Sequence, residues 1–212
     1  TWKIGRISMG NKKVLLGMSG GVDSSVSALL LKQAGYEVIG ATMELFCGSS
    51  CCNVNTYIDA KNVCNSIGIP HFIFNYQKEF REYVINDFIN CYKTCKTPKP
   101  CIECNKYLKF GIMYEKAKEM GCNYIATGHY ARIAQGADGR YSVKHAATAR
   151  KDQTYALYNL TQDQLARTLM PVGAYEKEQV REIAKKAGLP VASKPDSQDI
   201  CFIPDGDYAG FI

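Results

Sequence analysis

The sequence predicts an α/β protein built on an open parallel sheet with helices on both faces. Four short apolar runs with strand character alternate with helical segments between residues 13 and 127. The helical segments carry apolar residues three or four positions apart, which is the spacing of one helix face. Parallel strands need long crossover connections, and the helices in those connections cover both faces of the sheet.

Each predicted strand is a buried apolar run, and most predicted helices end at a glycine. The strands are Lys13–Met18, Glu37–Met43, His71–Asn75 and Tyr124–Thr127. The helices are Val22–Gln33, Ile58–Ile67, Phe80–Tyr92 and Asn105–Met120, and Gly35, Gly68 and Gly121 follow three of them. Strand and helix therefore alternate in chain order over this whole stretch.

The pattern changes after residue 127. Ala131–Ile133 and Tyr141–Val143 flank a turn that contains Gly139, which predicts a β-hairpin. Two further helices are predicted over Gln162–Leu169 and Lys177–Ala187, the second ended by Gly188 and Pro190. Residues 195–212 are polar, and we expect them to form a loop. A small helical and loop segment is thus expected to follow the sheet.

The composition fits one or two globular domains with a real core, because 46% of the 212 residues are hydrophobic. No stretch of about 18 apolar residues predicts a membrane span, and no signal peptide is visible. We therefore expect a cytoplasmic protein. The net charge of +6 is a mild bias towards anionic partners such as nucleic acid. Ten cysteines without a sign of secretion indicate metal, cluster or sulfur chemistry.

The segment Ser19–Ser24 predicts a pyrophosphate-binding loop. A Gly-Gly turn between a strand and a helix brings backbone amides close to an anion, and the helix N-terminus adds partial positive charge. No Gly-Lys-Ser/Thr follows, so the loop is not of the Walker type. Asp23 is a candidate Mg²⁺ ligand, and Ser19, Ser24 and Ser25 are candidate hydroxyl donors. We expect the chain to split ATP into AMP and pyrophosphate; the alternative is a glycine-rich turn capped by a serine.

The loop resembles the signature of the PP-loop ATP pyrophosphatases, which have an adenine nucleotide alpha hydrolase-like fold. Within that superfamily the chain is similar to the tRNA-specific 2-thiouridylases. The stretches that carry this second resemblance are Thr97–Asn105, Ala126–Ala131, Lys151–Tyr155 and Asp196–Phe202. The resemblance implies that the enzyme adenylates the C2 carbonyl oxygen of the wobble uridine in tRNA. Sulfur then displaces AMP to form 2-thiouridine, so tRNA and a sulfur donor are the implied partners.

The resemblance also implies a division of the chain. Residues 1–8 show no pattern and are taken as a remnant preceding a natural start at Met9. Residues 9–160 would form the PP-loop ATP-pyrophosphatase domain, and residues 161–212 the start of a central tRNA-binding region. Family members continue into a β-rich C-terminal domain, and we expect this shortened chain to be without it. We expect such a shortened chain to bind tRNA weakly.

Site residues follow from the same resemblance. ATP and Mg²⁺ are the implied cofactors. The residues expected at ATP are Gly17, Met18, Ser19, Gly20, Gly21, Val22, Asp23, Ser24, Ser25, Met43 and Gly128. The residues expected at tRNA are Lys99, Lys151, Asp152 and Gln153. For Met43 a place in the core, and for the triplet at 151–153 an ordinary solvated surface, are the alternatives.

Three cysteines are the candidate catalytic residues. The resemblance implies that Cys104 is a nucleophile and that Cys201 carries a persulfide from the sulfur donor. We expect Cys104 just before a helix that starts near Asn105, where the helix N-terminus, Lys99 and Lys106 would stabilise a thiolate. The alternative for each cysteine is a buried, inert side chain.

The chain departs from the commonest family pattern at Lys99, where Asn is usual, and at Cys101, where Asp is usual. Cys101, Cys104 and Cys201 together could ligate a [4Fe–4S] cluster that keeps one iron open for sulfide. Zinc would normally require a fourth protein ligand. A persulfide relay and a cluster-borne sulfide therefore both remain open, and the third thiol slightly favours the cluster.

The remaining cysteines are expected to be structural. Cys64 and Cys122 are isolated, whereas Cys91 and Cys95 share a helix face. Cys47, Cys51 and Cys52 resemble half of a metal site without a second half. His129 lies near the proposed site, but we assign it no acid–base role. Two further functions stay open: another PP-loop ligase or amidotransferase, and a nucleotide- or cluster-binding sensor.

Overall fold

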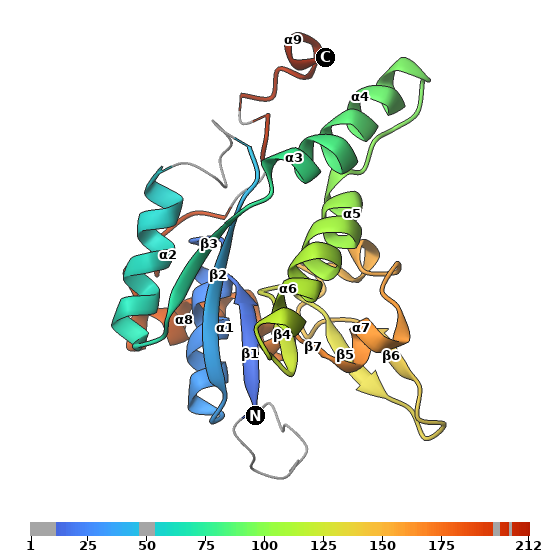
Figure 1. Cartoon of the computed structure of the whole chain (residues 1–212). Coiled ribbons are helices and arrows are strands. Elements are labelled where there is room, and N and C mark those ends of the chain that lie inside the picture. Colours follow the sequence, from blue (N-terminus) through green and yellow to red (C-terminus); the bar gives the residue numbers. More distant parts are fainter. Residues whose placement is uncertain (1–11, 47–53, 197–199, 204) are drawn as a thin grey trace.

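The computed structural model describes residues 12–46, 54–196, 200–203 and 205–212. Five parallel strands form one sheet in the order β3-β2-β1-β4-β7. Their bounds are β1 Lys13–Gly17, β2 Glu37–Glu44, β3 His71–Asn75, β4 Tyr124–Ala126 and β7 Thr168–Leu169. The predicted open parallel sheet is confirmed, and its carboxyl end points towards the two long helical segments of Figure 1.

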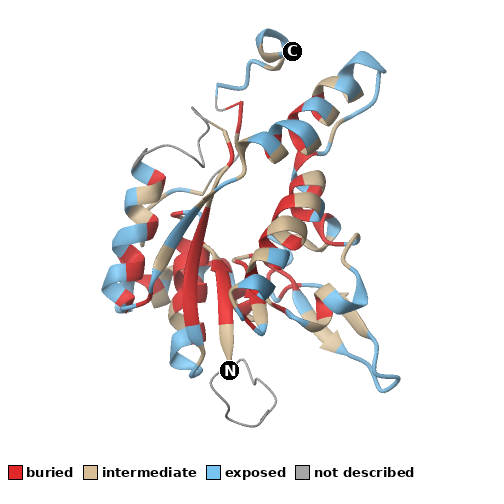
Figure 2. Cartoon of the chain, viewed as in Figure 1, coloured by how far each residue is buried: buried red, intermediate tan, exposed pale blue. Residues whose placement is uncertain are grey.

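Helices cover both faces of this sheet because side chains alternate along β1. Val14 and Leu16 belong to a core with α1 (Val22–Gln33), α2 (Val54–Ile67) and α8 (Lys177–Lys186). Leu15 belongs to a second core with α6 (Met113–Glu119) and the helix before it. The buried colour of β1, β2 and α1 in Figure 2 marks the contact between these layers.

Two long helical segments extend past the carboxyl end of the sheet (Figure 1). The first joins α3 (Gln77–Phe80), the π-helical segment η1 (Arg81–Ile85) and α4 (Asn86–Lys93). The second joins α5 (Pro100–Glu103), the π-helical segment η2 (Cys104–Ile112) and α6. A third core lies between them and takes in Phe202 and Ile203 from the end of the chain. Phe202 stacks edge-on against Phe80 and Phe88, with ring centroids 5.6 and 5.3 Å apart.

Several predicted boundaries were wrong. The helix predicted from Asn105 begins at Pro100, because proline fits the first helical position and extends the helix towards the chain start. Cys101 and Cys104 therefore lie inside the helical segment and not in a loop before it. The helix predicted from Ile58 begins at Val54, and the one predicted from Phe80 begins at Gln77.

The segment after residue 160 also differs from the prediction. The helix predicted over Gln162–Leu169 ends at Ala166, and Thr168 and Leu169 form the fifth strand by pairing with β4. The spacing of apolar residues alone does not distinguish a helix from a short strand at Thr168 and Leu169. Their pairing with β4, which is distant in sequence, makes them a strand. The tail expected to be a loop buries Phe202 and Ile203 and adds the short helix α9 (Tyr208–Phe211).

The remaining elements connect the sheet and the helices. The predicted hairpin is present as β5 (Arg132–Gln135) and β6 (Tyr141–Lys144). Short helices follow as η3 (Thr154–Ala156), α7 (Gln162–Ala166) and η4 (Pro171–Ala174). Strand β7 joins the sheet, and helix α8 joins the core, that residues before 160 form. The predicted division between a PP-loop domain at 9–160 and a tRNA-binding region at 161–212 stays a prediction. In the described part of the chain, no helix is long and apolar enough to cross a membrane.

The packing of Phe202 yields a stability prediction. Replacing Phe202, which is 3% exposed, with alanine should lower the free energy of unfolding by about 3–5 kcal/mol, because it removes a ring from a packed core. Urea unfolding followed by circular dichroism measures the change. Phe72→Ala is the matched control, since Phe72 is 45% exposed. Equal losses in the two variants would show that the tail is not docked on this core.

Candidate functional site

The loop after β1 makes a sharp turn that requires glycine. The Met18 amide donates to the Ala41 carbonyl at 2.8 Å, which holds the start of the loop against β2. Gly20 has a φ of +65°, and a Cβ there would lie 2.6 Å from the Thr56 carbonyl oxygen. Glycine is the residue type that adopts this backbone conformation without strain and needs no room for a Cβ.

The first turn of α1 is left without a side-chain cap. Gly21 is the N-cap residue, and within the described structure no side-chain cap bond is formed there. The Ser24 and Ser25 hydroxyls instead donate to the Gly21 carbonyl at 3.1 and 2.8 Å. They therefore brace the turn, and the uncapped N–H groups give a helix terminus that suits an anion.

Gly128 follows β4 and touches the same helix terminus. A Cβ at this position would lie 2.8 Å from the Ser24 nitrogen and 2.9 Å from the Asp23 carbonyl carbon. The glycine is thus required by the approach of α1 itself. Gly128 also lines the cavity beside the loop, and its predicted position near a nucleotide stays a prediction.

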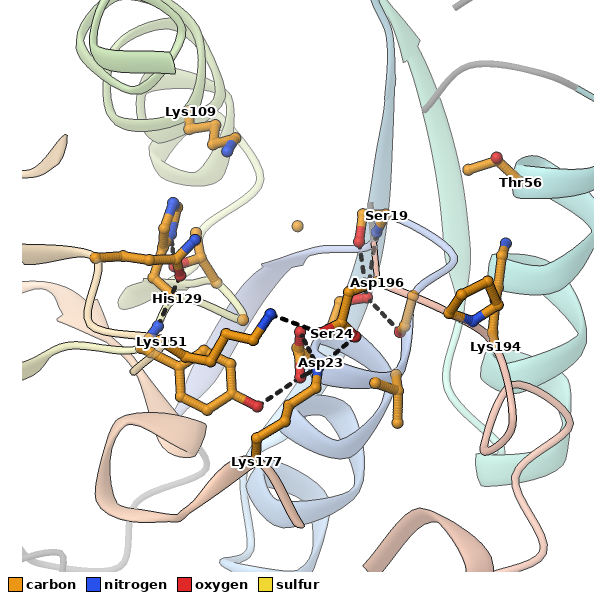
Figure 3. A pocket seen from close by; sticks show the side chains of 18 residues that line it. Ser19, Asp23, Ser24, Thr56, Lys109, His129, Lys151, Lys177, Lys194 and Asp196 are labelled. Atoms are coloured by element: carbon orange, nitrogen blue, oxygen red, sulfur yellow. Dashed lines mark hydrogen bonds and ion pairs between the residues drawn. The ribbon is translucent and has the colours of Figure 1, made fainter. Parts of the chain in front are cut away.

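A polar cavity of about 380 Å³ opens beside the loop at the carboxyl end of the sheet. This is the edge at which open α/β sheets bind ligands. Of the residues predicted at ATP, the cavity is lined by Gly17, Ser19, Gly21, Val22, Asp23, Ser24 and Gly128. Four lysines also line it, namely Lys109, Lys151, Lys177 and Lys194 (Figure 3). The donor-rich loop and these cations fit a polyphosphate.

An ion-pair network around the buried Lys177 ties the loop to Asp196. Lys177, which is 7% exposed, donates to both carboxylate oxygens of Asp23 at 2.7 and 2.9 Å. Its ammonium group also lies 2.8 Å from a carboxylate oxygen of Asp196. Arg181 pairs with the same Asp196 at 2.8 Å. Lys151 also pairs with Asp196, at 3.0 Å (Figure 3). The network therefore joins α1, α8 and the segment that leads to Cys201.

The network determines how its acids ionise. Burial alone would raise the pKa of Asp196, but hydrogen bonds from Lys177 and Lys151 hold that pKa below its ordinary value. The Tyr130 hydroxyl donates to Asp23 at 2.7 Å, and burial, followed by the charge of Asp23, raises the pKa of Tyr130. Asp23 thus accepts hydrogen bonds from two side chains within the protein. Its predicted role as a Mg²⁺ ligand would require it to share or give up some of them.

His129 and the triplet 151–153 have structural partners as well. Burial and the charge of Lys109 lower the pKa of His129 well below its ordinary value, so the ring is neutral, and it bonds Thr127 at 2.7 Å. Gln153 accepts from the Tyr130 amide at 2.9 Å. Asp152 accepts from the Ala146 amide at 2.7 Å and does not line the cavity.

A second, apolar cavity of about 220 Å³ lies beside the first. It is lined by all three predicted catalytic cysteines and by Met18 and Met43. Cys104 is buried, Cys201 is half-buried and Cys101 is exposed. The structure thus gathers in one cavity the thiols that the sequence places almost a hundred residues apart.

The cysteine arrangement does not fit a cluster as it stands. Among the described residues, no three His, Cys, Asp or Glu side chains are grouped closely enough to hold a metal ion. A [4Fe–4S] cluster would require the thiols around this cavity to move together. The predicted half-site Cys47, Cys51 and Cys52 lies outside the described residues.

Other predicted residues lie away from this site. Lys106 is exposed, donates to Tyr107 at 2.8 Å and does not line the cysteine cavity, so its expected help to Cys104 stays a prediction. Lys99 is exposed and lines neither cavity. Burial raises the pKa of Cys64 to about 11 and also raises that of Cys122, which suits inert thiols. Cys91 lies 3.8 Å from Asp87 on α4.

Sequence reasoning missed the lysines that complete the polar cavity. The segments that contain Lys109, Lys177 and Lys194 have the pattern of amphipathic helices or surface loops, in which a lysine is common. Only the fold brings Lys194 to the loop, where it donates to the Gly20 carbonyl at 3.0 Å and to Asp59 at 2.6 Å. Asp196, in contrast, begins a stretch that the sequence had already marked.

Comparison with known proteins identifies the family. A family model described as "tRNA methyl transferase HUP domain" matches residues 12–205. The chain belongs to this family. The chain is 55% identical over 210 residues to the tRNA-specific 2-thiouridylase MnmA of Clostridioides difficile. The aligned region covers 95% of this chain and 58% of the relative. It therefore spans less than two thirds of that curated relative, and the resemblance inferred from the sequence is confirmed.

Solved structures confirm the fold class. A 4-thiouridine synthetase in complex with RNA and ATP matches this chain with a TM-score of 0.58 at 19% identity. The match covers 92% of this chain and 46% of the synthetase chain. The U34-tRNA thiolase NcsA from Methanococcus maripaludis, with its [4Fe-4S] cluster, matches with a TM-score of 0.56 at 17% identity, over 92% and 63%. At such identities the likeness shows the PP-loop fold alone.

The ion-pair network predicts a pH-dependent stability. Asp196→Asn should lower the free energy of unfolding near neutral pH by about 1.5–3 kcal/mol, because charged hydrogen bonds to a buried lysine are lost. Since the folded-state pKa of Asp196 lies below its ordinary value of 3.8, its contribution is present above that pH and is lost as the pH falls through the folded-state pKa. The difference between variant and wild type should therefore shrink below about pH 4.

Urea unfolding at several pH values measures this difference. Asp138→Asn is the matched control, because Asp138 is exposed on the hairpin turn and forms no ion pair in the described structure. A loss in Asp196→Asn that stayed constant down to pH values well below that range would contradict the assignment.

Proposed function

We propose that the chain is the ATP-using part of a tRNA-specific 2-thiouridylase. The observation that carries this proposal is the contact between a cavity rich in lysines and loop donors and an apolar cavity lined by three cysteines. Ser19 lines both cavities. A carbon atom activated at the first cavity would thus lie within reach of thiols in the second.

The polar cavity suits the phosphates of ATP, with Mg²⁺ bound to them. The uncapped N-terminus of α1 and the lysines supply positive potential where the phosphates would lie. The apolar cavity has Met43 in its wall and suits an uncharged ring more than a phosphate. We assign the nucleotide to Gly17–Ser25, Met43 and Gly128, and tRNA contacts to Lys99 and to Lys151–Gln153.

Adenylation turns the uridine C2 oxygen into a leaving group. The oxygen attacks the α-phosphorus, pyrophosphate leaves with the electron pair of the broken P–O bond, and the N3 proton passes to solvent. An amide-like oxygen is a poor leaving group, whereas AMP is a good one. The fixed dipoles of the loop stabilise charge that develops on the phosphate.

Two thiols suffice for the sulfur transfer. The terminal sulfur of a persulfide on Cys201, supplied by a sulfur donor, attacks C2, and AMP leaves with the electron pair of the C–O bond. The Cys104 thiolate then attacks the Cys201 sulfur, which forms a Cys104–Cys201 disulfide and releases 2-thiouridine. A thiol reductant restores both cysteines. Burial of Cys104 and partial exposure of Cys201 suit an acceptor inside and a carrier that meets its donor.

A cluster-borne sulfide is the second candidate route. Three thiols around one cavity favour it, and the similar U34-tRNA thiolase NcsA is described with a [4Fe-4S] cluster. The described arrangement would have to close around such a cluster. Anaerobic purification with iron and sulfide analysis decides between the routes, because an active but iron-free protein rules the cluster out.

The cysteine assignment predicts a separation of the two half-reactions. In full-length protein supplied with unmodified tRNA, ATP and a sulfur source, Cys104→Ala should release pyrophosphate but form no 2-thiouridine. Mass spectrometry of tRNA nucleosides and a pyrophosphate assay measure the two steps. Cys95→Ala is the matched control, since Cys95 is exposed and lines neither cavity. Normal thiolation by Cys104→Ala would refute the proposed sulfur path.

A further inference from the structure

One cation lies at the junction between the two cavities. Of the described residues that line them, Ser19 and Lys109 alone line both. Lys109 comes from η2, which carries Cys104 at its first position, and its side chain is half-buried. Figure 3 shows Lys109 reaching from that helix into the cavity, opposite the loop that carries Ser19.

The π-helical register explains why Lys109 and Cys104 meet the same cavity. These residues are five positions apart, and in an α-helix with 3.6 residues per turn such side chains point in clearly different directions. In a π-helix the hydrogen bonds join residues five apart, so the two side chains come close to one face. Both indeed line the apolar cavity. Such local π segments frequently occur at functional sites.

Lys109 differs from the other lysines of the polar cavity in its partners. Lys151 and Lys177 pair with Asp196, and Lys194 pairs with Asp59. Among the described residues, Lys109 forms no hydrogen bond or ion pair. Its charge is felt at the neighbouring buried His129, whose pKa it helps to lower after burial. A half-buried ammonium with no carboxylate beside it leaves its charge for an anion from outside the chain.

We propose that Lys109 is a catalytic residue that binds the α-phosphate of ATP where the two cavities meet and stabilises its charge in both chemical steps. The inference rests on the proposed function. In adenylation the uridine oxygen bonds to the α-phosphorus as the bond to pyrophosphate breaks. In sulfur transfer the bond from C2 to that oxygen breaks, and AMP takes the electron pair. Negative charge grows on oxygens of the same phosphate in both steps, and a fixed cation at the junction serves each.

Lys151, Lys177 and Lys194 are better placed to hold the polar cavity together than to stabilise charge on the α-phosphate. Their charges are largely compensated by Asp196, Asp23 and Asp59, so they hold the loop and the tail in place. None of them lines the cysteine cavity in the described structure. Among the residues that the structure describes, Lys109 alone combines a place at both cavities with an uncompensated charge.

The test compares three variants of the full-length protein with wild type. Lys109→Met removes the charge and keeps the chain length, Lys109→Arg keeps the charge, and Lys118→Met removes an exposed lysine of α6, farther along the same helical segment. The readouts are kcat and KM(ATP) for tRNA-dependent pyrophosphate release, and single-turnover formation of 2-thiouridine. Thermal unfolding of each variant checks the fold.

We expect Lys109→Met to lower kcat for pyrophosphate release about 100-fold while KM(ATP) changes less than about threefold, because the lost interaction strengthens in the transition state. Lys109→Arg should recover a large part of kcat, and Lys118→Met should match wild type. Wild-type kcat in Lys109→Met, or a rise in KM(ATP) alone, overturns the inference. If Lys109→Met unfolds, a Lys109→Arg variant that folds but has no more activity than background also overturns it.

The same experiment separates this inference from the proposed function. Wild-type protein that forms no 2-thiouridine refutes the proposed function. Active wild-type protein together with an equally active Lys109→Met refutes the role of Lys109 alone.

Discussion

Burial of the Lys177 ammonium constrains the whole site, because a buried charge is costly unless it is paired and hydrogen-bonded. Its two carboxylate partners come from different parts of the chain: Asp23 lies in the first turn of α1, and Asp196 precedes the segment that carries Cys201. Pairing this one lysine therefore holds the start of α1, α8 and Asp196 together. The loop cannot shift without leaving that buried charge unpaired.

Glycines around the loop and a π-helical segment in the second long helix bring backbone and side chains close to the two cavities. Gly20 lets the loop lie against the backbone of α2, and Gly128 lets α1 approach the end of β4, so the helix terminus reaches the cavity floor. On the opposite wall, the π register of η2 turns Cys104 and Lys109 to one side. The site is therefore built from backbone choices as much as from reactive side chains.

The sequence predicted the parallel sheet and the loop, because strand ends, glycines and a motif of contiguous residues are local signals. The expectation that the three cysteines lie together rested on the family resemblance. It missed β7, whose two residues are strand only by pairing with β4. It placed Cys104 outside a helix, because Pro100 was not taken as a first helical residue. Lys177 and Lys109 stayed hidden for another reason: their roles depend on partners, or on the absence of partners, that only three-dimensional packing decides.

The two cavities impose an order on any chemistry that uses both. The polar cavity holds cations and helix dipoles, which favour a negative phosphate, whereas the apolar cavity would penalise the same charge. An activated intermediate should then keep its phosphate in the first cavity and extend its planar ring into the second. The reacting carbon would lie where the cavities meet, which is where Ser19 and Lys109 lie. Because AMP would leave towards the polar cavity while sulfur approaches from the apolar one, attack and departure occur on opposite sides and neither group has to cross the path of the other.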